Sequence, residues 1–412
     1  MSRRRVVVTG VAGISPIGND WPTIEASLRA ERSGVVNLAQ WGEYDGLNTR
    51  LAAPAAPFEL PKETYNRKRT RSMGRVAVMA VRTAELALAD AGLLDHPVLT
   101  SGRTGVSYGS STGTPDAVGD FGKMLLNKST EGVNANSYLK MMSHTTAVNI
   151  SVFFGLTGRV FTTSSACTSG SQGIGSAYEA IRYGQATVMV AGGAEELSVT
   201  EAAVFDTLFA TSTRNDTPHL SPRPYDADRD GLVIGEGACT LILEEYEHAL
   251  ARGAKIYAEV IGYGSNCDGS HVTQPSAATM AVAMQLALDD AGVNASQIGY
   301  INGHGTATEH GDIAETQASA QLFGKNAPIS SLKSYMGHTL GACGALEAWL
   351  TIEMMNSGWF APTLNLQNID PRCGDLDYIS SGGRNIICDY VMSNNFAFGG
   401  INTSLIFRNT KV

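Results

Sequence analysis

The stretch from Phe161 to Gly184, FTTSSACTSGSQGIGSAYEAIRYG, decides the expected fold. A β-prone run from Arg159 to Thr163 leads through small residues to Cys167, and a helical pattern then extends from Ser169 to about Arg182. The pattern predicts a strand, a tight turn that carries a thiol, and a helix. Unpaired N–H groups and the helix dipole at such a position both favour the thiolate. The alternative is an inert packed cysteine.

The composition is typical of a large α/β enzyme. The 412 residues can form a large core or two domains, and 45 glycines suit many tight turns and close backbone contacts. A net charge of −9 argues against nucleic acid as the main partner. The six cysteines are scattered, and no run is long enough to span a membrane. We therefore expect a protein of the cytoplasm, without a membrane partner and with free thiols.

The chain repeats its own pattern. The phrase LALADAGL at residues 86–93 returns as LALDDAGV at residues 286–293, and a strand with a glycine-rich loop follows each copy. The segment around Cys167 is likewise matched by Ile329 to His338 and a helical pattern behind it. Such a repeat predicts two related α/β halves, with mostly parallel sheets covered by helices. We place the halves at residues 1–253 and 254–412.

The duplication is expected to bring reactive side chains from the two halves to one place. If Cys167 lies at a strand end of the first half, the matching loops of the second half carry His304, Lys333 and His338. One thiolate with histidines could form a protease-like pair. However, two imidazoles aimed at one carbonyl oxygen could also stabilise a negative oxygen, as enolate chemistry on a thioester requires. A covalent acyl-thiol beside such a pair predicts carbon–carbon bond formation.

Other motifs do not meet their full patterns. The TGVAG segment after the first strand lacks the spacing of a dinucleotide-binding turn. Asp226 to Gly231, DADRDG, resembles the start of a calcium loop, but Gly237 occupies the twelfth position where a glutamate is needed. A structural turn network is the expected alternative. His304 and His310 lack a third ligand at metal spacing, so we predict no metal site.

A dense basic run is the last local feature. It consists of Lys62, Arg67, Lys68, Arg69, Arg71 and Arg75. The run is either the solvated face of a helix start or a docking patch for an acidic partner, which it would attract on an otherwise acidic protein.

The ordered motifs resemble those of the β-ketoacyl-acyl carrier protein synthases, the elongating condensing enzymes of type II fatty acid and polyketide pathways. The matching segments run from the first strand to the last and are VVVTGVAGISPIG, SSACTSG, STRNDTPHLSPRPYDADRDGLVIGEGA, GHGTATEHGD, KSYMGHTLGACGALE and NNFAFGGINTS. The resemblance implies a duplicated thiolase-like fold, layered αβαβα with two pseudo-symmetric halves. It also implies a dimer, either of two copies or with a related subunit, in which residues around Tyr138 to Met142 close the partner's acyl pocket.

The resemblance implies roles for the residues that match its motifs. Cys167 would take the acyl group from the carrier thioester, and the N–H groups of Cys167 and Phe398 would hold the oxyanion. His304 and His338 would stabilise the enolate that malonyl decarboxylation leaves, and its attack would give the β-ketoacyl product and CO2. The other implied roles are an ion pair with Lys333 for Glu347, a gate for Phe398, pantetheine contacts for Thr306 and Thr308, acyl-pocket positions for Phe205 and Thr112, and carrier docking for Lys68 and Arg71. No cofactor is implied, since phosphopantetheine arrives on the carrier.

Departures from the family pattern concern the acyl chain. Thr112 is polar where such enzymes often carry Gly or Ile, and hydroxyl residues at 110, 111 and 162–165 lie near the expected pocket. They suggest an unsaturated, aromatic or otherwise non-standard chain from a specialised pathway such as polyene synthesis. Three alternatives remain: a non-catalytic subunit of the chain-length-factor kind, a degradative thiolase that uses Cys343 as its second cysteine, and a starter-unit synthase, which would carry Asn in place of His338.

Overall fold

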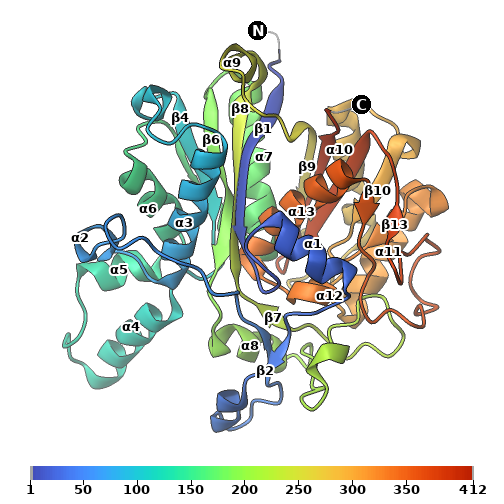
Figure 1. Ribbon diagram of the computed structural model, residues 1–412. Helices are drawn as coiled ribbons and strands as arrows, with labels where there is room; N and C mark the ends of the chain where they lie inside the picture. Colours follow the sequence, from blue (N-terminus) through green and yellow to red (C-terminus); the bar gives the residue numbers. More distant parts are fainter. Residues whose placement is uncertain (1–2, 411–412) are drawn as a thin grey trace.

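Two halves of similar construction share one ten-stranded sheet (Figure 1). The computed structural model describes residues 3–410, so the outermost residues of the two predicted halves lie outside the described residues. From its edge inward, the first half contributes β5 (Val160–Thr162), β4 (Thr104–Gly109), β6 (Val188–Glu195), β8 (Gly237–Glu245) and β1 (Val6–Ile14). The second half contributes β11 (Ile329–Ser330), β10 (Ile298–Asn302), β14 (Tyr390–Phe396), β15 (Ile401–Arg408) and β9 (Ala258–Cys267).

The duplication is visible in the strand order. We number the five large-sheet strands of each half by their order in the chain. From the edge of the sheet to its centre, both halves then have the order third, second, fourth, fifth and first. The two first strands, β1 and β9, pair antiparallel and join the halves. This arrangement confirms the predicted α/β fold with two pseudo-symmetric halves. The predicted boundary between residues 253 and 254 falls in the segment between Ala251, where α9 ends, and Ala258.

The prediction of mostly parallel sheets is wrong. Among the described residues, four strand pairings of the large sheet are parallel and five are antiparallel. The fifth strand of each half causes the difference, because β8 and β15 run against both of their neighbours. Only residues 397–400 join β14 to β15, and so short a connection permits an antiparallel return but no parallel crossover.

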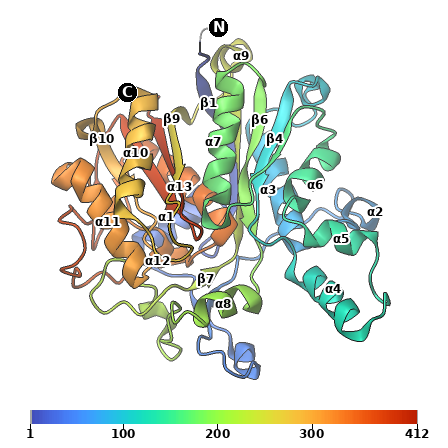
Figure 2. The same cartoon turned by 180° about the vertical axis from the view of Figure 1, so that it is seen from behind.

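Helices complete five layers. On the outer faces, α3 (Arg75–Asp90) and α6 (Thr145–Phe154) cover the first half, while α10 (Ala277–Ala291) and α11 (Glu309–Phe323) cover the second. Between the halves lie α7 (Ser169–Arg182) and α13 (Cys343–Ser357), and Figure 2 shows α7 in this central position. The layering is therefore αβαβα, as the family resemblance implied. The largest buried apolar cluster lies where these two helices pack on the sheet.

Small residues allow the two central helices to approach each other. A Cβ atom on Gly344 of α13 would lie 2.5 Å from the backbone nitrogen of Ser171 in α7. One on Gly170 would lie 2.8 Å from the nitrogen of Ala345. Both distances are shorter than a carbon atom tolerates, so the N-terminal ends of α7 and α13 can meet only because glycine occupies these positions. This contact places the turn before α7, which includes Cys167, against the loop that precedes α13.

The remaining elements lie outside the ten-stranded sheet and the six helices that layer it. The other helices are α1 (Trp21–Arg29), α2 (Arg67–Thr70), α4 (Pro115–Asn127), α5 (Ala135–Met141), α8 (Val199–Asp206), α9 (Tyr246–Ala251) and α12 (Lys333–Met336). Small sheets are formed by β2 (Val36–Asn37), β3 (Leu51–Ala53) and β7 (Ile234–Gly235), and by β12 (Trp359–Phe360) with β13 (Arg384–Asn385). No helix within residues 3–410 has the length and apolar character needed to cross a membrane.

Candidate active site

Cys167 lies in a single 3₁₀ turn, Ala166–Thr168, between β5 and α7. The turn is sharp because Ala166 adopts a left-handed conformation, with φ at 50°. The hydroxyl of Ser169 holds the turn by donating to the Ala166 carbonyl at 2.7 Å and accepting from the Ser165 N–H at 3.0 Å. The side chain of Cys167 is buried, at 4% exposure. The sequence thus folds locally as predicted: strand, turn with thiol, helix.

Loops of the second half bring the other expected residues to this thiol. His304 follows β10, Lys333 begins α12, and His338 follows α12. The Nε2 atom of His338 lies 2.9 Å from Sγ of Cys167. The ring centroids of the two histidines are 5.2 Å apart and the rings are nearly perpendicular, at 87°. The four residues that the duplication was expected to gather therefore lie in one buried cluster.

The protonation of the histidines follows from their surroundings. Burial, and then the positive charge of Lys333, lower the pKa of both His304 and His338 well below the ordinary value, so both rings are neutral. The N–H of Leu340 donates to Nδ1 of His338 at 3.3 Å. A neutral ring that accepts at Nδ1 carries its proton on Nε2. His338 therefore offers an N–H donor to whatever negative atom forms beside Cys167.

Lys333 and Glu347 form a fully buried ion pair behind the histidines. The second carboxylate oxygen of Glu347 accepts from the side-chain amide of Asn395 at 2.7 Å. The pair thus has the extra hydrogen bond that a buried ion pair needs. Its positive end is also what holds the histidine rings in the neutral form, together with burial. The contact predicted for Lys333 and Glu347 is present.

Opposing effects set the charge state of Cys167. Burial raises the pKa of the thiol to about 11, although Lys333 and the N–H groups of Phe398 and Cys167 act in the opposite direction. The N–H groups thus favour the thiolate, as predicted from the helix N-terminus, but desolvation, which the sequence does not reveal, outweighs them. The same two N–H groups are those expected to form the oxyanion hole, and both act on the sulfur.

We predict that alkylation of Cys167 by iodoacetamide accelerates about tenfold per pH unit between pH 7 and 9, since only the thiolate reacts and a pKa near 11 leaves it scarce throughout that range. Peptide mapping would separate Cys167 from the exposed Cys267. A rate that levels off below pH 8 would mean that the thiolate is the resting form after all.

A cavity of about 420 Å³ opens onto the thiol. Its lining includes Cys167, His304, His338, Phe205, Phe398 and the two threonines Thr306 and Thr308. The threonine hydroxyls lie 2.8 Å apart, near the end of the loop that carries His304. The ring centroids of Phe398 and Phe205 lie 5.0 Å apart. Most of the expected site residues thus line one continuous space that leads to Cys167.

Thr112 does not line this cavity. Its hydroxyl lies 3.3 Å from a carboxylate oxygen of Glu195 and 3.1 Å from one of Glu201. The hydroxyls of Ser110 and Ser111 also donate to Glu195. These hydroxyls do not line the cavity beside Cys167, because a buried carboxylate engages them, and the acyl-pocket role expected for Thr112 stays a prediction. Sequence reasoning did not single out Glu195 or Glu201.

The Sγ of Cys167 and one nitrogen of each histidine lie within 4.8 Å of one another, a spacing that a metal ion could use. The absence of a metal at this site stays a prediction, which metal analysis of the purified protein would test.

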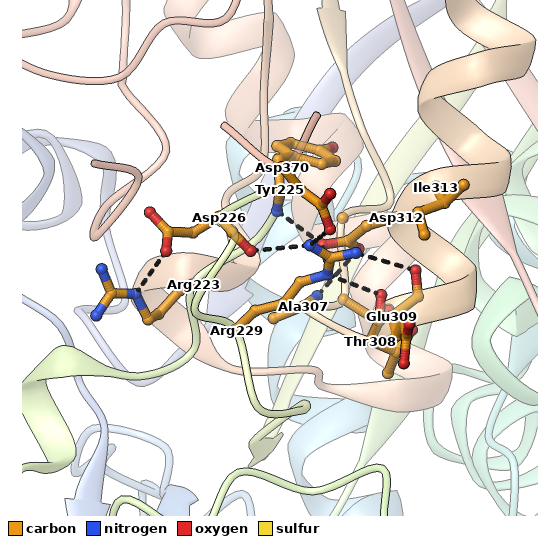
Figure 3. Close-up of polar contacts among 12 residues, drawn as sticks. Arg223, Tyr225, Asp226, Arg229, Ala307, Thr308, Glu309, Asp312, Ile313 and Asp370 are labelled. Carbon is orange, nitrogen blue, oxygen red and sulfur yellow. Dashed lines mark hydrogen bonds and ion pairs between the residues drawn. The ribbon is translucent and has the colours of Figure 1, made fainter. Parts of the chain in front are cut away.

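A polar network holds the His304 loop from below. The carboxylate of Glu315 accepts the N–H of His304 at 2.5 Å and that of Gly305 at 2.7 Å. Asp312 accepts the N–H of Ala307 at 3.1 Å and forms an ion pair with Arg229 (Figure 3). These contacts give Asp312 and Glu315 structural roles. Sequence reasoning did not identify Arg229, whose only signal is its place in the DADRDG turn.

Arg229 ties that turn to the loop. Its guanidinium pairs with Asp370 at 2.7 Å and donates to the carbonyls of Thr308 at 3.3 Å and Glu309 at 3.1 Å (Figure 3). In the same turn, Asp226 accepts the N–H of Asp228 at 2.9 Å. The calcium-like motif is thus a structural turn network, as its alternative interpretation predicted, and it positions the loop that carries His304.

We predict that Arg229→Met lowers the free energy of unfolding by about 3–5 kcal/mol, because the fully buried carboxylate of Asp312 loses its cation. Urea denaturation would measure this change. Arg372→Met is the matched control: Arg372 shares the partner Asp370, but its side chain is 53% exposed, so we expect little change. Equal losses in the two variants would contradict the proposed importance of the buried contact.

A thiolase-like fold that presents a buried thiol beside two neutral imidazoles defines a condensing enzyme of the acyltransferase type. Comparison with known families gives the same answer: "Beta-ketoacyl synthase, N-terminal domain" matches residues 3–249 and "Beta-ketoacyl synthase, C-terminal domain" matches residues 257–367. The chain belongs to the beta-ketoacyl synthase family.

Individual relatives support this assignment. The chain is 40% identical to 3-oxoacyl-[acyl-carrier-protein] synthase 2 of Vibrio cholerae, over 99% of this chain and 100% of that protein. A crystal structure of a beta-ketoacyl synthase from Burkholderia phymatum is 61% identical, with a TM-score of 0.97 over 99% of this chain and 100% of that one. The ishigamide ketosynthase/chain length factor is 31% identical, with a TM-score of 0.89 over 99% and 100%. A type II polyketide ketosynthase in complex with its acyl-carrier protein is 30% identical, with a TM-score of 0.88 over 99% and 100%.

Proposed function

We propose that this enzyme elongates an acyl chain by decarboxylative condensation with malonyl-acyl carrier protein, in fatty acid synthesis or in a specialised polyketide or polyene pathway. The observation that carries the proposal is the 2.9 Å approach of His338 Nε2 to Cys167 Sγ, with the His304 ring beside it. The thiol of Cys167 suits covalent acyl transfer, and the rings of His304 and His338 suit the stabilisation of an enolate. A condensing enzyme needs both in one cavity.

In the first half-reaction Cys167 accepts the acyl group. Its sulfur attacks the acyl-carrier thioester, and the N–H groups of Cys167 and Phe398 hold the oxygen that becomes negative. A bond forms between Sγ and the acyl carbon, and the bond from that carbon to the phosphopantetheine sulfur breaks. The thiol proton of Cys167 leaves with the departing phosphopantetheine thiol. The N–H of His338 lowers the barrier by stabilising the thiolate as it forms.

In the second half-reaction a malonyl thioester takes the place of the departed carrier. The donor N–H of His338, with the ring of His304 beside it, polarises the thioester carbonyl while the bond to the carboxylate carbon breaks and CO2 leaves. The resulting enolate attacks the acyl carbon on Cys167. The carbon–sulfur bond breaks, the β-ketoacyl-carrier forms, and the Cys167 thiolate takes up a proton. Neutral imidazoles suit this step because a charged imidazolium would donate its proton to the enolate.

Two alternatives are less well supported by the site. A non-catalytic subunit of the chain-length-factor kind lacks the nucleophile, which is present here in a cavity with both histidines. A degradative thiolase needs a second cysteine that reaches the substrate. Here the thiol of Cys343 donates to the backbone carbonyl of Cys167 at 3.2 Å, and Cys343 is not part of the cavity lining. His338 in place of Asn argues against a starter-unit synthase.

The partner we propose is an acidic acyl carrier protein, whose phosphopantetheine arm passes Thr306 and Thr308; the enzyme itself needs no cofactor. Lys68 in α2 and Arg71 beside it are exposed, and no ion pair within residues 3–410 engages either one. Arg69 and Arg75 of the same run instead contact Phe153 and Glu236. We further propose a dimer, with a second copy or a related subunit, and a cytoplasmic location, in keeping with six free cysteines.

The test is an assay of the purified protein with malonyl-carrier and an acyl-carrier primer. We expect CO2 release, a β-ketoacyl-carrier product by mass spectrometry, and an acyl adduct on Cys167 when the primer is supplied alone. If the protein gave no CO2, no product and no adduct, both alone and with any subunit that co-purifies with it, the proposed function would be wrong.

A further inference from the structure

Two buried glutamates lie near the nucleophile and have no part in the condensation. Glu195 ends β6, and Glu201 lies in α8. Both are nearly inaccessible, at 0% and 4% exposure. Within residues 3–410, no lysine, arginine or histidine forms an ion pair with either carboxyl group. Carboxyl groups buried without a cation are costly, so their hydrogen bonds decide which of them carries a charge.

Glu195 is surrounded by donors. Its carboxylate accepts the Ser110 hydroxyl at 2.8 Å, both the N–H and the hydroxyl of Ser111, at 2.8 and 2.5 Å, and the N–H of Gly341 at 2.9 Å. Such a set of donors stabilises a negative charge, as it does at other buried carboxylates. The negative charge of the cluster therefore belongs on Glu195.

Glu201 must then be the protonated member. The hydroxyl of Thr112 lies between the two groups, 3.3 Å from Glu195 Oε1 and 3.1 Å from Glu201 Oε1. A hydroxyl has one proton to donate, and the charged Glu195 takes it. Glu201 can bond to Thr112 only by donating a proton of its own through Oε1. Burial raises the pKa of both carboxyl groups, and the charge of Glu195 further raises the pKa of Glu201, well above its ordinary value.

The other oxygen of Glu201 has no partner. Oε2 is buried and has no partner in hydrogen-bonding geometry among the described residues, although the backbone N–H of Ser198, at the start of α8, also acts on this carboxyl group. With the proton on Oε1, Oε2 is a carbonyl oxygen that can only accept. A buried acceptor without a donor is rare in folded proteins and calls for a ligand or another explanation.

Its position points to the acyl chain. Glu201 lies one turn of α8 before Phe205, which lines the cavity of Cys167. The next residue, Ala202, belongs to the same apolar cluster as Cys167 and Leu340. The charge of Glu195 also acts on the thiol itself, and it raises the pKa of Cys167. Glu201 itself does not line the cavity, so the inference requires an acyl chain that extends from Cys167 beyond the cavity, along this apolar cluster.

We propose that Oε2 of Glu201 accepts a hydrogen bond from a hydroxyl group on the acyl chain, so that the enzyme prefers hydroxylated acyl primers to plain alkyl primers. This inference rests on the proposed condensing function and names its substrate class. A plain alkyl chain leaves the buried oxygen unpaired, whereas a chain with a hydroxyl at the right distance satisfies it.

The experiment compares matched primers on the carrier protein: alkanoyl chains of one length, with a hydroxyl at successive positions or with none. For wild type we expect kcat/KM to rise at least tenfold for one hydroxyl position. Glu201→Leu should remove that preference and leave the plain primer at least as good. Glu201→Gln, which keeps a donor for Thr112 and a carbonyl acceptor, should retain it. Thr200→Leu, on the exposed side of α8, is the matched control and should behave as wild type.

Two results would overturn the inference while the proposed function stands. One is a wild type that condenses all primers equally well, and the other is a Glu201→Leu variant that keeps the wild-type preference. Acylation of Cys167, followed by intact mass with each primer, gives the same comparison without the malonyl step. If none of the primers acylated Cys167 of the wild type and no CO2 were released, the proposed function itself would be contradicted.

Discussion

Replacing Cys167 by alanine is expected to abolish condensation while malonyl-carrier decarboxylation continues. Without Sγ no acyl adduct can form, so elongation should fall by roughly 10⁴-fold or more, as it does when a covalent nucleophile is removed from other enzymes. The groups that act on the malonyl carbonyl stay in place, because alanine changes neither the His304 ring nor the hydrogen bond from Leu340 that sets the proton of His338. CO2 release should therefore stay within about tenfold of wild type.

Both rates can be measured in one reaction, with carbonate capture for CO2 and mass spectrometry for the carrier products. Cys343→Ala is the matched control, since Cys343 is an equally buried thiol within 3.2 Å of the Cys167 carbonyl. We expect that variant to condense. If Cys343→Ala lost condensation and Cys167→Ala kept it, the nucleophile would be misassigned. Loss of decarboxylation in Cys167→Ala would mean that the sulfur also serves the enolate step.

Local pattern and internal repetition were enough to predict much of the fold. The helix expected from Ser169 to about Arg182 is α7, with those bounds. The repeat of residues 86–93 at 286–293 marks the C-terminal ends of α3 and α10, which cover equivalent faces of the two halves. The sheet directions were not predictable in the same way, because strand alternation does not reveal that residues 397–400 form a direct return between β14 and β15.

The site was predictable in its members but not in its charges. Cys167, His304, Lys333 and His338 could be placed together because the duplication puts their loops at matching strand ends. The protonation state of the thiol could not be predicted. The helix N-terminus is visible in the sequence, but the burial that raises the pKa of Cys167 is not. From the sequence alone, Ser110, Ser111 and Thr112 are expected to offer hydroxyls to a substrate. The residue that engages them, Glu195, is more than 80 positions away in the chain.

Replacing His338 by alanine should have the opposite effect to Cys167→Ala. The variant loses the N–H donor that faces the thiol and the developing enolate, and removal of one such donor typically costs 10²–10³-fold. We expect CO2 release to fall by about that factor. Acylation of Cys167 should fall less, because the N–H groups of Cys167 and Phe398 still hold the oxyanion of that step. Acyl-enzyme should therefore accumulate, visible by intact mass.

His310→Ala is the matched control for this prediction. His310 also lines the cavity, but its side chain is exposed and it lies at the start of α11, away from the sulfur. It should leave both half-reactions near the wild-type rate. Equal losses of acylation and decarboxylation in His338→Ala would indicate that the histidine acts mainly on the thiol, as in a protease-like pair. If His338→Ala loses mainly decarboxylation and Cys167→Ala loses mainly acylation, the two half-reactions fail separately. That result would assign the thiol to acyl transfer and the imidazole to the enolate.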